Sequence, residues 1–151
     1  MADVHTKAVR SYNMSQIRSK NTKPELVVRK YLFANGIRGY RLHVKSLPGK
    51  PDIVIKKLKT IIDVRGCFWH GHQNCKYGDK IKSESIGITE RVRSAIKRDK
   101  LNETKWRQLG WRVITIWDTC ELEVKRKISE KRGKILSELL KNLLQKSDTS
   151  N

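Results

Sequence analysis

The sequence has little of what secreted or membrane-embedded proteins need. Only three of its 151 residues are cysteines, an odd number that would leave one unpaired in a disulfide framework. No stretch approaches the length of an apolar membrane span, and the first residues, from Met1 to His5, contain no apolar segment of a secretory signal. We therefore expect a cytoplasmic protein without a membrane partner, in which a zinc ion accounts for the cysteines.

Acidic residues are also scarce. The chain has 15 Asp and Glu against 34 Lys and Arg, which gives a net charge of +19. This excess is far larger than solubility requires, so the charge predicts a polyanionic partner. Charge alone leaves a ribosomal or a membrane-surface protein open as alternatives.

Internal repeats and Gly/Ser/Pro-rich linkers are absent, and 151 residues suit one domain with a real core. We expect a single domain over 1–146 and a disordered tail over 147–151. Thr22, Pro24 and Glu25 predict a capped helix start, with a capping box between Thr22 and Glu25, and Gly36 predicts its end. The expected elements are helices over 11–18, 24–35 and 89–109, strands over 40–43, 52–55, 59–64 and 111–117, and a last helix whose apolar stripe runs over 128–144.

This order predicts an α/β fold with a small mixed central sheet flanked by helices. The long helix should bury apolar residues that recur at helical spacing. They are Val92, Ala95, Ile96, Leu101, Trp106 and Leu109. Neither the layout nor the stripe identifies a chemistry.

The most informative stretch is 66–75, which crowds two aromatic residues among metal-binding side chains directly after an apolar strand. Its cysteine and histidine spacing is Cys67-x4-His72-x2-Cys75, and the remaining cysteine, Cys120, follows a second apolar strand. A hydrophobic core has no use for these polar groups unless a metal or a reaction needs them. The stretch therefore suggests nucleic-acid chemistry with a bound metal.

A second group of residues is Pro51-Asp52, followed by Asp63 and Arg65 at the end of the next strand. Carboxylates on adjacent strands can hold the hard divalent cation that phosphodiester cleavage uses. The pattern resembles the signature of the type II restriction-enzyme superfamily. By itself it is weak, because Pro-Asp is often a plain turn and Asp63 could simply form a salt bridge with Arg65.

Together these segments closely resemble the Vsr family, the very-short-patch-repair DNA mismatch endonucleases, which use a variant of the restriction-endonuclease fold. The resemblance extends from Met1 to about Leu122. Its motifs are Arg10-Ser11-x-Asn13-Met14, Glu25, Leu47-Pro48-Gly49-x-Pro51-Asp52, Gly66-Cys67-Phe68-Trp69-His70, Arg98-Asp99, Leu109-Gly110-Trp111-Arg112-Val113, Trp117 and Cys120.

The resemblance implies a bacterial, nucleoid-associated enzyme, expected to be a monomer. Its substrate would be duplex DNA with a thymine opposite guanine, left by deamination of 5-methylcytosine, and it would nick the strand 5′ to the thymine. A cytosine methyltransferase would be functionally linked, and a MutL-type repair protein is a possible partner. The N-terminal arm, 1–20, would lie over the DNA.

The same resemblance implies roles for individual residues. Asp52 and the backbone carbonyl of Val64 would hold a catalytic Mg²⁺. His70 would be the general base, although it could instead support the site from outside or bind zinc. Glu25 would orient a catalytic histidine or a metal-bound water, or serve only in the capping box. Asp99 matches a site carboxylate, with a surface ion pair to Arg98 or Lys100 as the alternative.

Zinc would be held in a closed structural tetrahedron by four ligands. They are Cys67, His72, Cys75 and Cys120. Phe68 and Trp69 resemble the aromatic wedge that enters DNA beside the mismatch, and Ile88 stands where relatives carry a third wedge residue, a tryptophan. The alternative is that these aromatics belong to the core. His5 and His43 receive no role.

Asp63 and Arg65 depart from the family pattern. Strand alternation places both on one face, opposite Ile62 and Val64. Asp63 is then expected as a second metal ligand, and Arg65 is expected to hold the scissile phosphate, since arginine cannot act as a base. Two other functions stay open. One is a non-mismatch nicking, restriction or mobile-element endonuclease, and the other is a catalytically weakened protein that only binds mismatched DNA.

Overall fold

The structure is a computed structural model, and it describes residues 21–148. The expected helix over 11–18 and the N-terminal arm lie outside these residues. The elements in chain order are α2 (Lys23–Ala34), β1 (Arg41–Leu42), β2 (Ile53–Ile55), the 3-10 turn η1 (Lys56–Leu58), β3 (Thr60–Arg65), α3 (Lys76–Asp79), η2 (Lys80–Ser83), α4 (Ile86–Gln108), β4 (Arg112–Trp117) and α5 (Glu130–Asp148).

The four strands form one mixed sheet in the order β1-β2-β3-β4. β1, β2 and β3 pair in antiparallel fashion, and β4 runs parallel to β3 with Arg65 opposite Trp117. The antiparallel pair β2–β3 is joined by the short turn η1, whereas the parallel pair needs the long connection that contains α4. The α/β fold with a small mixed sheet is therefore confirmed.

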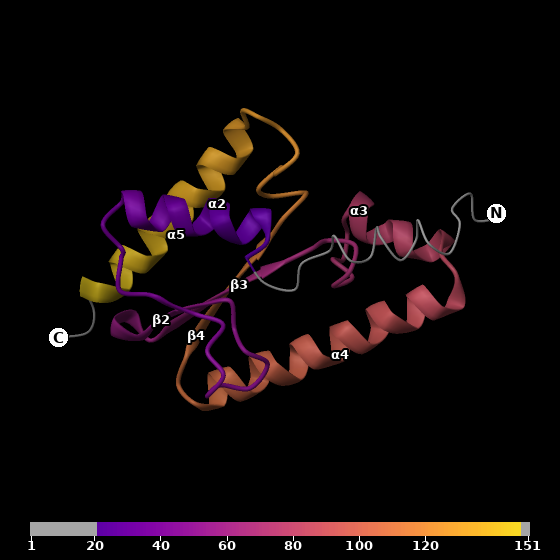
Figure 1. Cartoon of the computed structure of the whole chain (residues 1–151), viewed down its shortest axis with the longest axis horizontal. Helices are drawn as coiled ribbons and strands as arrows, with labels where there is room; N and C mark the ends of the chain where they lie inside the picture. The colour runs from indigo at the N-terminus through magenta and orange to yellow at the C-terminus, as the bar shows by residue number, and fades with distance from the viewer. Residues whose placement is uncertain (1–20, 149–151) are drawn as a thin grey trace.

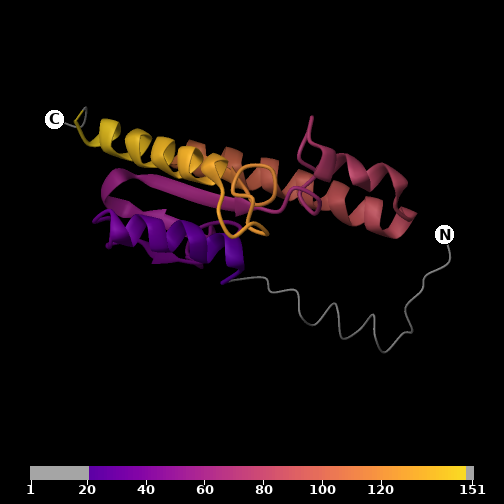
Figure 2. The same cartoon turned by 90° about the horizontal axis from the view of Figure 1, so that it is seen from above.

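Helices cover both faces of the sheet: α2 and α5 lie on one side and α4 lies on the other (Figure 1). The strands are buried on both faces, so consecutive residues alternate between two apolar clusters. Ile53, Ile55 and Ile62 pack with α2 and α5, whereas Val54 and Ile61 pack with Trp106 of α4. Seen from above, α2 and α5 run along the sheet while α3 lies beyond its end (Figure 2).

The start of α2 differs in detail from the capping box expected there. Thr22 is the N-cap residue but makes no side-chain capping bond. Glu25 instead accepts a hydrogen bond from the backbone N–H of Asn21 at 3.0 Å, one residue before the cap. The carboxylate still satisfies an N–H group near the helix start, and it is buried there.

The ends of the other helices also differ from expectation. α4 begins at Ile86, before the expected start at residue 89. Ile86 and Gly87 are weak helix formers, so the sequence pattern did not reveal the first turn. α3 and η2 were not expected. α5 begins at Glu130 and extends to Asp148, so residues 147–148 are helical rather than part of a tail.

Four apolar residues assigned to buried helical stripes are exposed, among them Leu144 of α5 at 53 %. Ile128 is 89 % exposed and lies before α5, and Leu101 and Leu109 are each 55 % exposed. The face of α4 that packs is narrower than the periodicity suggested, since the buried residues of this helix are Val92, Ala95 and Trp106. Within residues 21–148, no helix has the length and apolar character that crossing a bilayer requires.

Candidate functional site

A cavity of about 810 Å³ opens where α2 begins, β2 begins and β3 ends. Asp52 directly precedes β2, Asp63 and Arg65 lie on β3, and Glu25 lies in the first turn of α2. His70 and Asp99 line the same cavity from the turn after β3 and from α4. The tertiary structure thus gathers all six side chains predicted to be catalytic.

Asp52 lies at the centre of this group. Its Oδ2 accepts a hydrogen bond from the backbone N–H of Val64 at 2.9 Å, so the predicted metal-binding pair lies side by side. Burial and the charge of Asp63 raise the pKa of the Asp52 carboxyl to about 8. A cation bound among these carboxylates would offset their repulsion, which is the electrostatic arrangement that a divalent metal site needs.

His43 is the residue that sequence reasoning missed. It follows β1, and its Nε2 lies 3.3 Å from Oε2 of Glu25, while its Nδ1 lies 3.9 Å from Oδ1 of Asp52. One ligand atom from each of these three residues lies within 4.8 Å of the others. The backbone N–H of His43 donates to the carbonyl of Asp52, which brings the two residues together. No local motif marks this histidine, because the pairing of β1 with β2 creates the contact.

His70 and Asp99 form a direct pair. Nδ1 of His70 lies 2.7 Å from Oδ2 of Asp99. The side chain of His70 is about one-third exposed, whereas that of Asp99 is mostly buried. Each of two carboxylates thus lies against a histidine of the cavity, Asp99 against His70 and Glu25 against His43, and the expected role of Glu25 stays a prediction. The alternative expected from the sequence was a surface ion pair of Asp99 with Arg98 or Lys100. In the structure the carboxylate of Asp99 lies against His70 instead.

Arg65 is enclosed by carboxylates. Its Nε lies 2.8 Å from Oδ2 of Asp63 and 3.9 Å from Oδ2 of Asp99, and its Nη2 lies 3.6 Å from Oε2 of Glu103. The Asp63–Arg65 contact confirms that the two residues share one face of the strand. It also confirms the salt bridge that the sequence left open as the simpler interpretation of this pair. The phosphate-holding role of Arg65 stays a prediction, as does Asp63 as a metal ligand.

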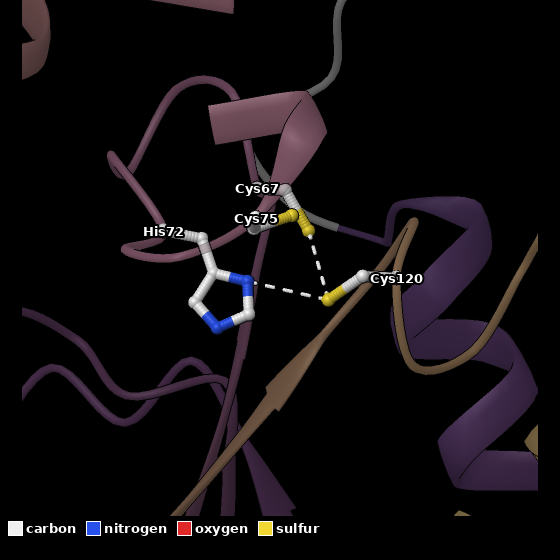
Figure 3. Close-up of side chains that lie close together, drawn as sticks. All are labelled: Cys67, His72, Cys75 and Cys120. Carbon is white, nitrogen blue, oxygen red and sulfur yellow. Dashed lines mark hydrogen bonds between the residues drawn. The ribbon is translucent and has the colours of Figure 1, made fainter. Parts of the chain in front are cut away.

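The second polar cluster brings Cys120 to three residues that are close together in the sequence, Cys67, His72 and Cys75 (Figure 3). Sγ of Cys67 lies 3.5 Å from Sγ of Cys120, which lies 3.2 Å from Nδ1 of His72. Ligands about 2.3 Å from a tetrahedral zinc are about 3.8 Å apart, so three sulfurs and one imidazole at these separations fit zinc.

The surroundings treat the three thiols differently. Burial raises the pKa values of Cys67 and Cys120. Burial also opposes ionisation of Cys75, but the backbone N–H groups of Gly78 and Tyr77 outweigh it and lower the pKa of that thiol.

The ring of His72 stacks on Trp117 with the centroids 3.9 Å apart. Asp118 connects the two clusters, because it lines the cavity and its Oδ1 accepts from the backbone N–H of Cys67.

Phe68 and Trp69 lie in the turn that follows β3. They contact each other edge to face, with ring centroids 5.0 Å apart. Trp69 lines the cavity and is 37 % exposed, whereas Phe68 is half-buried. Ile88 is half-buried in the first turns of α4. The wedge role of all three stays a prediction.

The chain is similar to known proteins of one family. The family model for DNA mismatch endonuclease Vsr matches residues 2–77. The chain is 42 % identical over 139 residues to the type II nicking enzyme V.NmeAIP of Neisseria meningitidis, covering 92 % of this chain and 97 % of that one. It is 44 % identical over 113 residues to V.XorIIP of Xanthomonas oryzae, covering 75 % and 81 %.

A further relative is the DNA mismatch endonuclease Vsr of Escherichia coli, 34 % identical over 130 residues that cover 86 % of this chain and 81 % of the relative. A mixed sheet with acidic residues at its strand ends is the arrangement of restriction-endonuclease-like proteins. The chain belongs to the Vsr family of DNA mismatch endonucleases.

Proposed function

We propose that the chain is a Mg²⁺-dependent endonuclease that nicks duplex DNA 5′ to the thymine of a T:G mismatch. The observation that carries this proposal is the meeting of two pairs in one cavity: Asp52 with the backbone of Val64, and His70 with Asp99. The first pair suits a hard cation and the second suits proton transfer. Both are needed for phosphodiester hydrolysis.

Asp52 and the carbonyl of Val64 would hold Mg²⁺, with Asp63 as a further ligand. The ion would supply Lewis-acid stabilisation of the charge that develops on the scissile phosphate. The chain's own contribution includes proton removal from the attacking water by His70. Because Asp99 accepts a hydrogen bond from Nδ1–H of His70, Nε2 keeps a lone pair to take that proton.

Recognition would combine charge with shape. The net charge of +19 supplies phosphate contacts that are independent of sequence and sensitive to salt. Phe68, Trp69 and Ile88 would enter the duplex beside the mismatch, where unstacking costs least. Zinc held by Cys67, His72, Cys75 and Cys120 would brace the turn that presents the aromatics. A cognate cytosine methyltransferase and a MutL-type protein are the proposed functional partners.

A second candidate is nicking that does not require a mismatch. It is favoured by two relatives, V.NmeAIP and V.XorIIP, which are named type II nicking enzymes. Labelled duplexes carrying T:G, U:G or T:A at one position, incubated with and without Mg²⁺, separate the two. Preferential nicking of T:G with Mg²⁺ supports the mismatch enzyme. Equal nicking of the T:A duplex supports the alternative, and mismatch binding without a nick indicates a binding protein that lacks catalysis.

A further inference from the structure

We propose that His43 is a direct ligand of the divalent cation held at Asp52, so that the site contains an imidazole nitrogen as well as carboxylate oxygens. This inference rests on the proposed function, because it concerns the same cation site. It adds a residue that neither the motif of Asp52 nor the strand of Asp63 contains.

The geometry brings three potential ligands to one point. Glu25, His43 and Asp52 come from α2, the residue after β1 and the residue before β2, and one ligand atom of each lies within 4.8 Å of the others. Nitrogen and oxygen ligands lie about 2.0–2.2 Å from such a cation, so two ligands of one ion are at most about 4.4 Å apart. The imidazole of His43 lies within this limit of both carboxylates, at 3.3 Å from Glu25 and 3.9 Å from Asp52.

The imidazole of His43 has unused hydrogen-bonding capacity. Its Nε2 is buried and has no hydrogen-bond partner, although Glu25 lies 3.3 Å away. A buried polar atom without a partner is costly, and a cation would satisfy it. The backbone of His43 has φ +46°, a left-handed conformation that residues other than glycine rarely adopt.

The ligand set has a chemical consequence. Oxygen ligands suit Mg²⁺, which keeps several waters, whereas an imidazole favours transition metals over Mg²⁺. A site that holds its cation with an imidazole as well as carboxylates should therefore bind Mn²⁺ more tightly than Mg²⁺. Mn²⁺ is also the suitable probe, because the sulfur-rich cluster at Cys67 does not favour it.

The test measures Mn²⁺ binding to the full chain with its cysteine cluster loaded with zinc. Free Mn²⁺ is followed by electron paramagnetic resonance, and Mg²⁺ affinity is obtained by competition. His43→Asn is the suitable variant, because asparagine also tolerates a left-handed backbone. Loss of an outer partner alone costs about 10–100-fold in metal affinity, so His43→Asn should weaken Mn²⁺ binding at least about tenfold and Mg²⁺ binding less.

A second measurement needs no substitution. Spin-echo spectra of Mn²⁺ bound to the wild-type chain should show coupling to a histidine nitrogen, and ¹⁵N-labelling of histidine should change its frequency. His70→Gln is the matched control, because His70 lines the same cavity but lies outside the three-residue group. This control should keep the nitrogen coupling, whereas His43→Asn should lose it.

The outcomes separate the two proposals. Asp52→Asn should lose both Mn²⁺ and Mg²⁺, and unchanged binding in that variant would refute the cation site itself. If Asp52→Asn loses the ions while His43→Asn keeps wild-type Mn²⁺ affinity and nitrogen coupling, only the role of His43 is refuted. Absence of histidine coupling in the wild-type chain would refute that role too, and would leave His43 as an ion-pair partner of Glu25 and Asp52.

Discussion

His70 and Asp99 are 29 residues apart in the chain, yet Nδ1 of His70 lies 2.7 Å from Oδ2 of Asp99. The turn after β3 carries the histidine, and α4 carries the carboxylate across the cavity. Gly71 permits this approach: it has a positive φ, and a Cβ there would collide with the side chain of Ile96 on α4. The pair therefore depends on close packing between the turn and the helix.

His70→Ala should lower the nicking rate by about 10²–10⁴, the usual contribution of general acid–base catalysis. Asp99→Asn should lower it by a smaller factor, because the imidazole remains but loses the charged partner that orients it. Single-turnover nicking of a T:G duplex measures both rates. A wild-type rate in His70→Ala across neutral pH would assign the base to another group.

Asp52→Ala should abolish nicking while preserving binding to T:G duplexes. The substitution removes a charged ligand from the cation site, whereas the basic surface and the aromatic pair remain. Nicking assays and gel-shift titrations on the same protein preparation test this. Near wild-type nicking by the variant would exclude Asp52 as an essential ligand.

Cys120→Ser should reduce the zinc content below one ion per chain and lower the melting temperature markedly, because structural zinc contributes on the order of 10 kcal/mol in small sites. Gln73→Ala is the matched control, since Gln73 is exposed in the loop between His72 and Cys75. Elemental analysis and thermal unfolding report the two effects. Folded wild-type protein without zinc would contradict the assignment.

Trp69→Ala and Phe68→Ala should weaken binding to T:G duplexes more than binding to matched duplexes, because matched DNA is held mainly by phosphate contacts. Phe33→Ala is the control, because it removes an aromatic ring from a different surface: Phe33 lies on α2 and is 52 % exposed. Equal losses on both duplexes would place Phe68 and Trp69 in a purely structural role.

Arg65→Ala should reduce the free energy of unfolding by about 3 kcal/mol, because it leaves carboxylates around a mostly buried position without their partner. Arg107→Ala should change it by less than about 1 kcal/mol, because Arg107 is exposed although it also pairs with Glu103. Urea denaturation measures both. If Arg65 also holds the scissile phosphate, nicking by Arg65→Ala slows without a loss of Mg²⁺ affinity. An unchanged unfolding free energy in Arg65→Ala would show that the carboxylate contacts are not stabilising.

Local sequence patterns predicted the order of the strands and the long helices within the described residues, because alternation and helical periodicity depend on near neighbours. They were less accurate for helix ends. The start of α4 and the exposed position of Ile128 differ from expectation, since the extent of packing against the sheet decides how much of each apolar stripe is buried.

The sequence by itself determined the family and the mixed α/β fold, because ordered motifs and residue periodicity are written along the chain. Only the tertiary structure decided which polar side chains meet. It placed His43 between Glu25 and Asp52, paired Asp99 with His70, and enclosed Arg65 among acidic residues. Strand pairing and helix packing bring together residues far apart in the chain, and no local pattern records those contacts.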